Sequence, residues 1–113
     1  MVATYIQPVF VSNAFVIDVS NWDYVVAQFV SPSGTISITA TNDSGDVEGI
    51  TDGGPATATN FTAIQATKLA DGTAVTAVAA AGLYKMNVVG RYIKFSGASA
   101  SATKIIIMLA KIS

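Results

Sequence analysis

A strict alternation of polar and apolar side chains constrains the fold of this chain more than any other feature. Residues 35–41 read Thr-Ile-Ser-Ile-Thr-Ala-Thr, and residues 91–96 repeat the pattern. In residues 15–19 the alternate positions form another apolar face, with Asp18 pointing away. Successive side chains of a β-strand point to opposite faces, so each segment predicts a half-buried antiparallel strand. The predicted inward side chains are Ile36, Ile38 and Ala40, then Ile93 and Phe95, and finally Phe15, Ile17 and Val19.

The choice of residues predicts strands along the whole chain. There are 13 Val, 11 Ile and 12 Thr against three Leu and one Glu, and β-branched side chains suit a pleated sheet. Runs of such residues, separated by turn residues, predict strands near 4–11, 14–19, 24–30, 34–42, 61–69, 73–78, 83–89, 91–96 and 103–112. Eight or nine short strands predict an all-β fold, an antiparallel β-sandwich of the jelly-roll type, with a closed barrel as the alternative.

The chain has the length of one domain. Its 113 residues favour a single hydrophobic core, and we assign residues 13–113 to the sandwich. Residues 1–12 are predicted to be an N-terminal arm or an edge strand, because Pro8 interrupts the hydrogen-bonded ladder. Turn residues predict a hairpin at Ser31–Gly34 and a two-residue hairpin at Asp71–Gly72.

A shortage of charge favours association with other chains. Only 12% of the residues are charged, whereas about 25% is usual in soluble domains. Apolar surface patches mark contacts between chains, although the 49 Ala, Gly, Ser and Thr residues would also cover a monomer. The runs 24–30 and 105–109 are apolar on both faces, which is typical of strands covered on both sides. The predicted subunit or capsid contacts are Tyr24, Val26, Phe29, Ile105, Ile107 and Leu109.

The charges divide between the two halves of the chain. Six of the seven acidic residues precede residue 53, and all six basic residues follow residue 67. Cross-strand pairing within one sandwich would use this division, and so would head-to-tail contact between neighbouring copies. Nucleic-acid binding is not expected, because it needs an excess of Lys and Arg.

Several kinds of chemistry are excluded by missing residues. The chain has no Cys and no His, which excludes disulfides, thiol nucleophiles, histidine acid–base catalysis and ordinary zinc sites. The serines lack a histidine base and the glycines form no phosphate-binding motif, so we expect neither an enzyme nor a cofactor. The densest apolar run, Ile105–Ala110, is far shorter than the ~20 residues that span a bilayer, and no basic residue precedes Phe15. We therefore expect no membrane partner and no secretory signal.

Two features suggest a ligand. Residues 42–52 are acidic but do not match the calcium-binding loop, because Val47 stands where that loop needs glycine when counting starts at Asn42. In the cluster Asn21–Tyr24, the rings of Trp22 and Tyr24 would stack on a sugar ring if they were exposed, whereas a buried Trp22 would be a core anchor. The long segment 42–60 is the best place for a binding surface. The candidate ligand residues are Trp22, Tyr24, Asp43, Asp46, Glu48 and Asp52, and no metal site is assigned.

Three stretches of the sequence resemble a known class of proteins. NWDYVVAQFV at 21–30, SGTISITATNDSG at 33–45 and GLYKMNVVGRYIKFSGASASATKIIIMLAKIS at 82–113 are similar to small virion structural proteins of tailed bacteriophages. The likeness covers residues 20–113 and consists mainly of the β-sandwich pattern, so it transfers no functional residue.

The resemblance implies a head decoration (cement) or head-fibre protein, or a tail component. Such a protein would act as a homo-oligomer, with a trimer favoured, and would bind the major capsid protein or another virion protein. It would reside in the virion, and in the host cytoplasm before assembly. The rival hypothesis is a monomeric carbohydrate-binding β-sandwich that uses Trp22, Tyr24 and the segment 42–60.

Overall fold

The computed structural model describes residues 2–6, 9–10, 15–30, 34–45, 54, 57–87, 90–97 and 103–112. Every regular element among them is a β-strand, which confirms the all-β prediction. The strands are β1 (Val2–Ile6), β2 (Val9–Phe10), β3 (Phe15–Asp18), β4 (Tyr24–Val30), β5 (Ile36–Thr41), β6 (Thr62–Ala63), β7 (Ala66–Lys68), β8 (Ala74–Val75), β9 (Ala77–Val78), β10 (Gly82–Asn87), β11 (Tyr92–Gly97) and β12 (Thr103–Lys111). Within these residues there is no helix long and apolar enough to cross a membrane.

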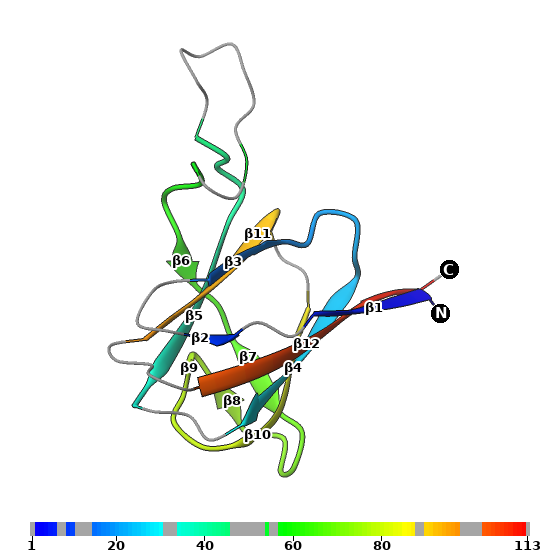
Figure 1. The fold of residues 1–113 in the computed structure, drawn as a ribbon, viewed down its shortest axis with the longest axis vertical. Coiled ribbons are helices and arrows are strands. Elements are labelled where there is room, and N and C mark those ends of the chain that lie inside the picture. Colours follow the sequence, from blue (N-terminus) through cyan, green and yellow to red (C-terminus); the bar gives the residue numbers. More distant parts are fainter. Residues whose placement is uncertain are drawn as a thin grey trace.

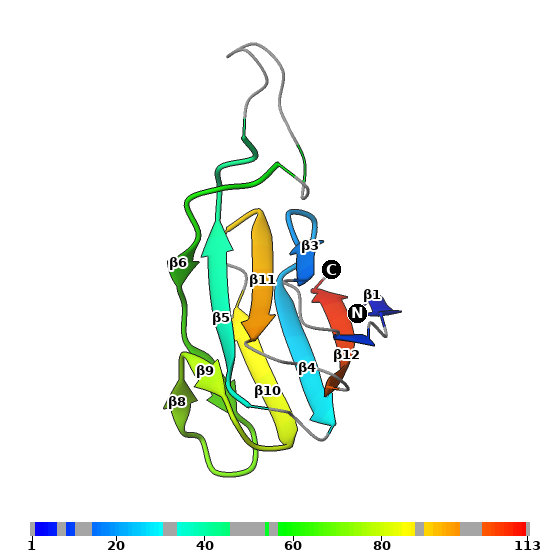
Figure 2. The same cartoon turned by 60° about the vertical axis from the view of Figure 1, so that its left-hand side comes forward.

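The strands form two antiparallel sheets, one of seven strands and one of five, that pack as a sandwich (Figure 1, Figure 2). In the larger sheet β1 pairs with β12, and β4 lies between β12 and β10. In the smaller sheet β11 lies between β3 and β5, and β6 follows β5. Early strands thus pair with late ones, as in a long hairpin that has been rolled up. This is the strand order of a jelly roll, as the sequence predicts.

The core lies between the sheets and holds the side chains that the alternation predicts. Most of the predicted inward residues are buried, namely Ile17, Val19, Ile36, Ile38, Ala40, Ile93 and Phe95, while Phe15 is half-buried against them. Asp18, which alternates with Phe15 and Ile17, is exposed. The two-residue period therefore predicts the inner face of β3, β5 and β11 correctly.

Phe29 of β4 joins the two layers of the core. Its ring makes edge-to-face contacts with Tyr84 of the same sheet, 5.5 Å between ring centroids, and with Phe95 of the opposite sheet, 5.9 Å. The hydroxyl of Tyr84 donates a hydrogen bond to the carbonyl of Ala80 at 3.1 Å, so its polar atom is satisfied although the ring is buried.

The predicted strands 61–69 and 73–78 each divide into two short strands that lie in different sheets. β6 pairs with β5 in the smaller sheet, whereas β7 pairs with β10 in the larger one. On the return, β8 pairs with β7 and β9 pairs with β5. The chain therefore crosses between the layers twice and covers one side of the sandwich (Figure 2). The predicted strand 4–11 is likewise two strands, β1 and β2, both paired with β12.

The predicted hairpin at Ser31–Gly34 is wrong. The segment leads from β4 to β5, and these strands belong to different sheets. Glycine and proline mark a reversal of the chain, but they do not distinguish a hairpin within one sheet from a crossing between two sheets.

The hairpin around Asp71–Gly72 does form, between β7 and β8. Its loop is longer than two residues, because the N–H of Lys68 donates to the carbonyl of Thr73 at 2.8 Å and Leu69 begins the turn. Gly72 has a φ of 79°, in the left-handed region that favours glycine. The position of the turn is thus predicted correctly and its length is not.

Replacing Phe29 should test the join between the layers. We expect Phe29→Ala to lower the free energy of unfolding by about 3–5 kcal/mol, because it leaves a cavity beside Tyr84 and Phe95. Urea titration would measure the change, with Gln28→Ala, exposed on the same strand, as the control that shifts by less than about 0.5 kcal/mol. A loss below about 1 kcal/mol for Phe29→Ala would contradict this role.

Candidate functional site

The two strands that are apolar on both faces lie side by side in the larger sheet. β12 pairs with β4 along its length, with Met108 opposite Val26 and Ile106 opposite Gln28. Because the neighbouring residues Ile107 and Leu109 are in the core, Ile106 and Met108 point away from it. The outward side chains of the larger sheet include Tyr5, Tyr24, Val26, Gln28, Leu83, Lys85, Lys104, Ile106 and Met108, which together we call the outer sheet face. The polar, exposed Gln28 lies between Ile106 and Leu83.

The outer sheet face carries an apolar stripe that runs across the strands. Val26, Ile106 and Met108 at its centre are half-buried by one another and by their neighbours. Tyr5 of β1 lies next to Met108 and is 71% exposed, and Leu83 of β10 is 46% exposed. All described strands belong to the two sheets, so no third layer of strands covers this stripe in the described part of the chain. Contiguous apolar surface of this kind is typical of a contact with another protein.

The predicted contact residues divide between the two faces of the larger sheet. Tyr24 and Val26 lie on the outer sheet face, half-buried. The other four, Phe29, Ile105, Ile107 and Leu109, are at most 3% exposed and belong to the core. They are therefore inaccessible to a subunit or a shell that binds the folded chain. In the run 105–109, which is apolar at every position, periodicity does not reveal which alternate set faces inward. In β4 the exposed Gln28 marks the face of Tyr24 and Val26 as the outer one.

Two of the lysine side chains lie over aromatic rings. The Nζ of Lys85 is 4.7 Å from the centre of the Tyr24 ring, and the Nζ of Lys94 is 4.5 Å from that of Phe61. These contacts combine cation–π attraction with burial of the methylene groups of each lysine.

The carboxylates of Asp18 and Asp23 have neutral partners. Asp18 accepts hydrogen bonds from the backbone N–H and the hydroxyl of Ser20, at 2.9 and 2.6 Å. Asp23 accepts from the backbone N–H of Ile112 at 2.6 Å, which fastens the end of β12 to the β3–β4 turn. These two acids are thus not used for the cross-strand ion pairs that the division of charge suggested, and head-to-tail contact between copies stays a prediction.

Asp43 organises the base of the long segment 42–60. Its carboxylate accepts hydrogen bonds from the backbone N–H of Gly45 at 2.9 Å, the amide of Asn60 at 2.7 Å and the hydroxyl of Thr59 at 3.2 Å. These bonds, that from Gly45 most of all, lower the pKa of Asp43 below its ordinary value. Gly45 has a φ of 72°, and a Cβ there would lie 2.1 Å from the carbonyl oxygen of Thr57. The base of this segment is therefore a defined, hydrogen-bonded stem.

The candidate ligand residues are not brought together where the structure describes them. Trp22 packs partly buried against the core, whereas Tyr24 lies on the outer sheet face, so these two rings do not form a common sugar platform. Asp46, Glu48 and Asp52 lie outside the described residues. Among the residues that are described, no three of the His, Cys, Asp and Glu side chains gather as metal ligands would.

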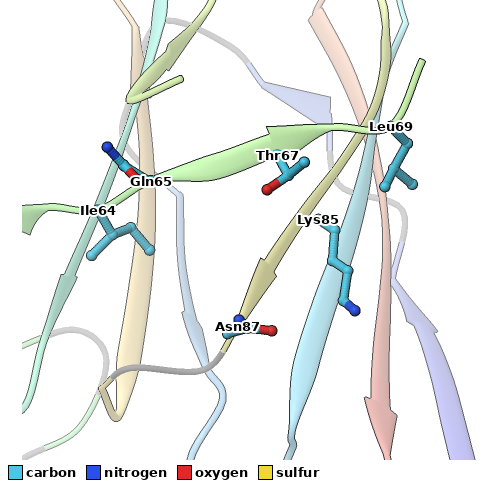
Figure 3. A pocket seen from close by; sticks show the side chains of 6 residues that line it. All are labelled: Ile64, Gln65, Thr67, Leu69, Lys85 and Asn87. Atoms are coloured by element: carbon cyan, nitrogen blue, oxygen red, sulfur yellow. The ribbon is translucent and has the colours of Figure 1, made fainter. Parts of the chain in front are cut away.

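A depression beside the outer sheet face was not predicted. It has a volume of about 620 Å³ and is lined by Ile64, Gln65, Thr67, Leu69, Lys85 and Asn87 (Figure 3). Thr67 of β7 pairs with Lys85 of β10, and Asn87 follows two residues later on the same face. Hydroxyl and amide groups and the Lys85 side chain therefore line one hollow and can bond to polar groups of a ligand or of a neighbouring protein. The sequence gives no sign of it, because its lining depends on β7 and β10 becoming neighbours.

The comparisons with known proteins identify a solved structure with a similar fold. No family model and no curated protein matches the chain. The chain is similar to a solved structure titled "Crystal structure of SPBc2 prophage-derived protein YomS", with a TM-score of 0.65 and 12% sequence identity. The match covers 96% of this chain and 95% of that chain, so the likeness extends over the whole sandwich. At this identity the likeness shows a shared fold, and the structural neighbour is prophage-derived.

Acid should loosen the stem of the segment 42–60. A carboxylate with a lowered pKa stabilises the fold above its ordinary pKa, about 3.9, and that contribution is lost as the pH falls through the lowered value. We expect the NMR signal of the Asn60 side-chain amide to shift only below this ordinary pKa. In Asp43→Asn the pH dependence should disappear. A midpoint at or above the ordinary aspartate value would contradict the assignment.

Proposed function

We propose that this chain is a structural protein of a tailed-bacteriophage virion, where it associates with copies of itself and binds the capsid shell. The observation that carries the proposal is the outer sheet face, whose apolar stripe has no covering layer in the described part of the chain. The prophage-derived neighbour supports the phage setting, since the two chains match over nearly their full lengths. The three resembling stretches of sequence support the same class of protein.

Association would work by burial of apolar surface. Each Å² of apolar area removed from water contributes about 25 cal/mol, and stable interfaces bury about 800 Å² on each partner. Central residues such as Ile106 and Met108 would supply the dry centre of the contact. Lys85 and Lys104, at its border, would favour a partner surface with acidic groups. Repeated copies on a lattice would then hold the shell by many weak contacts acting together.

The proposed location on the head is one of several within the same class. A decoration or cement protein on the capsid is our first assignment, and a head-fibre or tail component is the alternative. All of them use the sandwich as a binding unit and none requires catalysis.

A monomeric carbohydrate-binding module is the second candidate function. The depression lined by Gln65, Thr67, Lys85 and Asn87 favours it, because such groups bond well to sugar hydroxyls. The separation of Trp22 from Tyr24 weighs against it, since stacking platforms for sugars use exposed aromatic faces.

Met108→Glu should test the proposal, because it places a charge at the centre of the stripe. We expect light scattering on a sizing column to give an oligomer for the natural chain, and self-association at least about tenfold weaker for Met108→Glu. Ser37→Glu, exposed on the smaller sheet, is the matched control and should keep the natural mass. Mass spectrometry of particles from the phage that encodes the chain should detect the natural chain and the control.

Two results would contradict the proposal. A natural chain that stays monomeric at high concentration would contradict self-association. A natural chain that is missing from purified particles would contradict a role in the virion.

A further inference from the structure

The edges of the two sheets differ in how well they are protected against pairing with another chain. β8 and β6, at two of the edges, have two residues each, and β3, at a third, ends in the charged Asp18. Short strands and charges are the usual means of protecting an edge. The two-residue β9 lies at the same edge as β6. The fourth edge consists of β1 and the two-residue β2, and the five residues of β1, Val-Ala-Thr-Tyr-Ile, contain neither a charge nor a proline. Of the edges that the structure describes, β1 is the best template for a further strand.

Both faces of β1 are open to solvent. Ala3, Thr4 and Tyr5 follow one another along the strand and are all exposed, although their side chains alternate between the faces. β1 is paired with β12 alone (Figure 1). Within the described residues, one side of β1 therefore has no strand paired to it, and its exposed side chains lie on both faces.

We infer that β1 pairs with β1 of a second copy of this chain, antiparallel and about a two-fold axis that passes beside Thr4. In this register Ala3 lies opposite Tyr5 of the second copy, and Thr4 lies opposite its own counterpart. A small side chain opposite a large one, and Thr opposite Thr, are favourable cross-strand pairs. A two-fold contact also closes on itself, so that no free edge of this kind is left.

The outer sheet face supplies the reason for a second copy as the partner. Tyr5 lies on that face next to Met108, and a two-fold axis perpendicular to the sheet keeps the outer faces of both copies on the same side. Pairing would join the two apolar stripes into one continuous surface. The inference rests on the proposed self-association and adds a second contact to it: β1 joins two copies side by side, while the stripe of the pair stays available to further copies or to the shell.

A single cysteine would report the pairing, because the natural chain has none. Opposed residues of antiparallel strands have Cα atoms about 4.5–5.5 Å apart, a separation that a disulfide spans. We expect Thr4→Cys to form a covalent dimer under mild oxidation, seen on a non-reducing gel. Ala74→Cys, exposed on β8 at the opposite edge, is the control and should cross-link at least about tenfold more slowly, since only paired strands hold thiols at high effective concentration.

Thr4→Lys provides a second, independent test. It sets two like charges opposite each other across the axis and should at least halve the mass measured by light scattering. The circular dichroism spectrum should match that of the natural chain, because Thr4 is exposed and its replacement leaves the core unchanged.

The outcomes separate this inference from the proposed function. Preferential cross-linking of Thr4→Cys, together with a lower mass of Thr4→Lys in light scattering, supports strand pairing. An oligomeric natural chain with no preferential cross-link, and with Thr4→Lys unchanged in mass, overturns the pairing and leaves the wider association standing. A natural chain that is monomeric and does not cross-link overturns both.

Discussion

The pairing of β4 with β12 at the centre of the larger sheet is the contact on which the rest of the structure depends. Both strands are apolar at almost every position, so each must be covered on two faces to leave water. Their inner side chains meet the smaller sheet, where Phe29 joins the layers through Tyr84 and Phe95. Their outer side chains form a stripe that the described chain leaves uncovered. The same two strands thus build the core and the surface that we propose for assembly.

Local patterns in the sequence predict the strands well and their partners poorly. Alternation identifies the inner faces of β3, β5 and β11, because those strands have one polar face. In β4 the polar Gln28 marks the face of Tyr24 and Val26 as the outer one, a signal that the prediction of two apolar faces passed over. Alternation fails for β12, where Ile107 looks no different from Ile106 until the layers are placed. Turn residues locate the reversals, but Ser31–Gly34 leads to the other sheet, a choice made by packing of distant strands. The depression is lined by residues of β7 and β10, and it exists only because these two strands pair with each other.

Charge is distributed unevenly along the chain, but several charged side chains make contacts with uncharged groups. Lys85 and Lys94 lie over aromatic rings, and Asp18, Asp23 and Asp43 accept hydrogen bonds from nearby neutral groups. Polar groups are thereby satisfied without ion pairs between these residues, and the apolar stripe is left bordered by lysines. This character agrees with the binding role that we propose, and the prophage-derived structural neighbour has a similar overall fold.

Methyl NMR during dilution would test most directly whether the outer sheet face is the surface of association. Met108 and Ile106 point outward, while Met86 and Ile107 are fully buried and act as internal references. The methyl signals of Met108 and Ile106 should shift as the protein is diluted, while those of Met86 and Ile107 should stay in place. Outer signals that stay unchanged while the mass of the particle falls would contradict it.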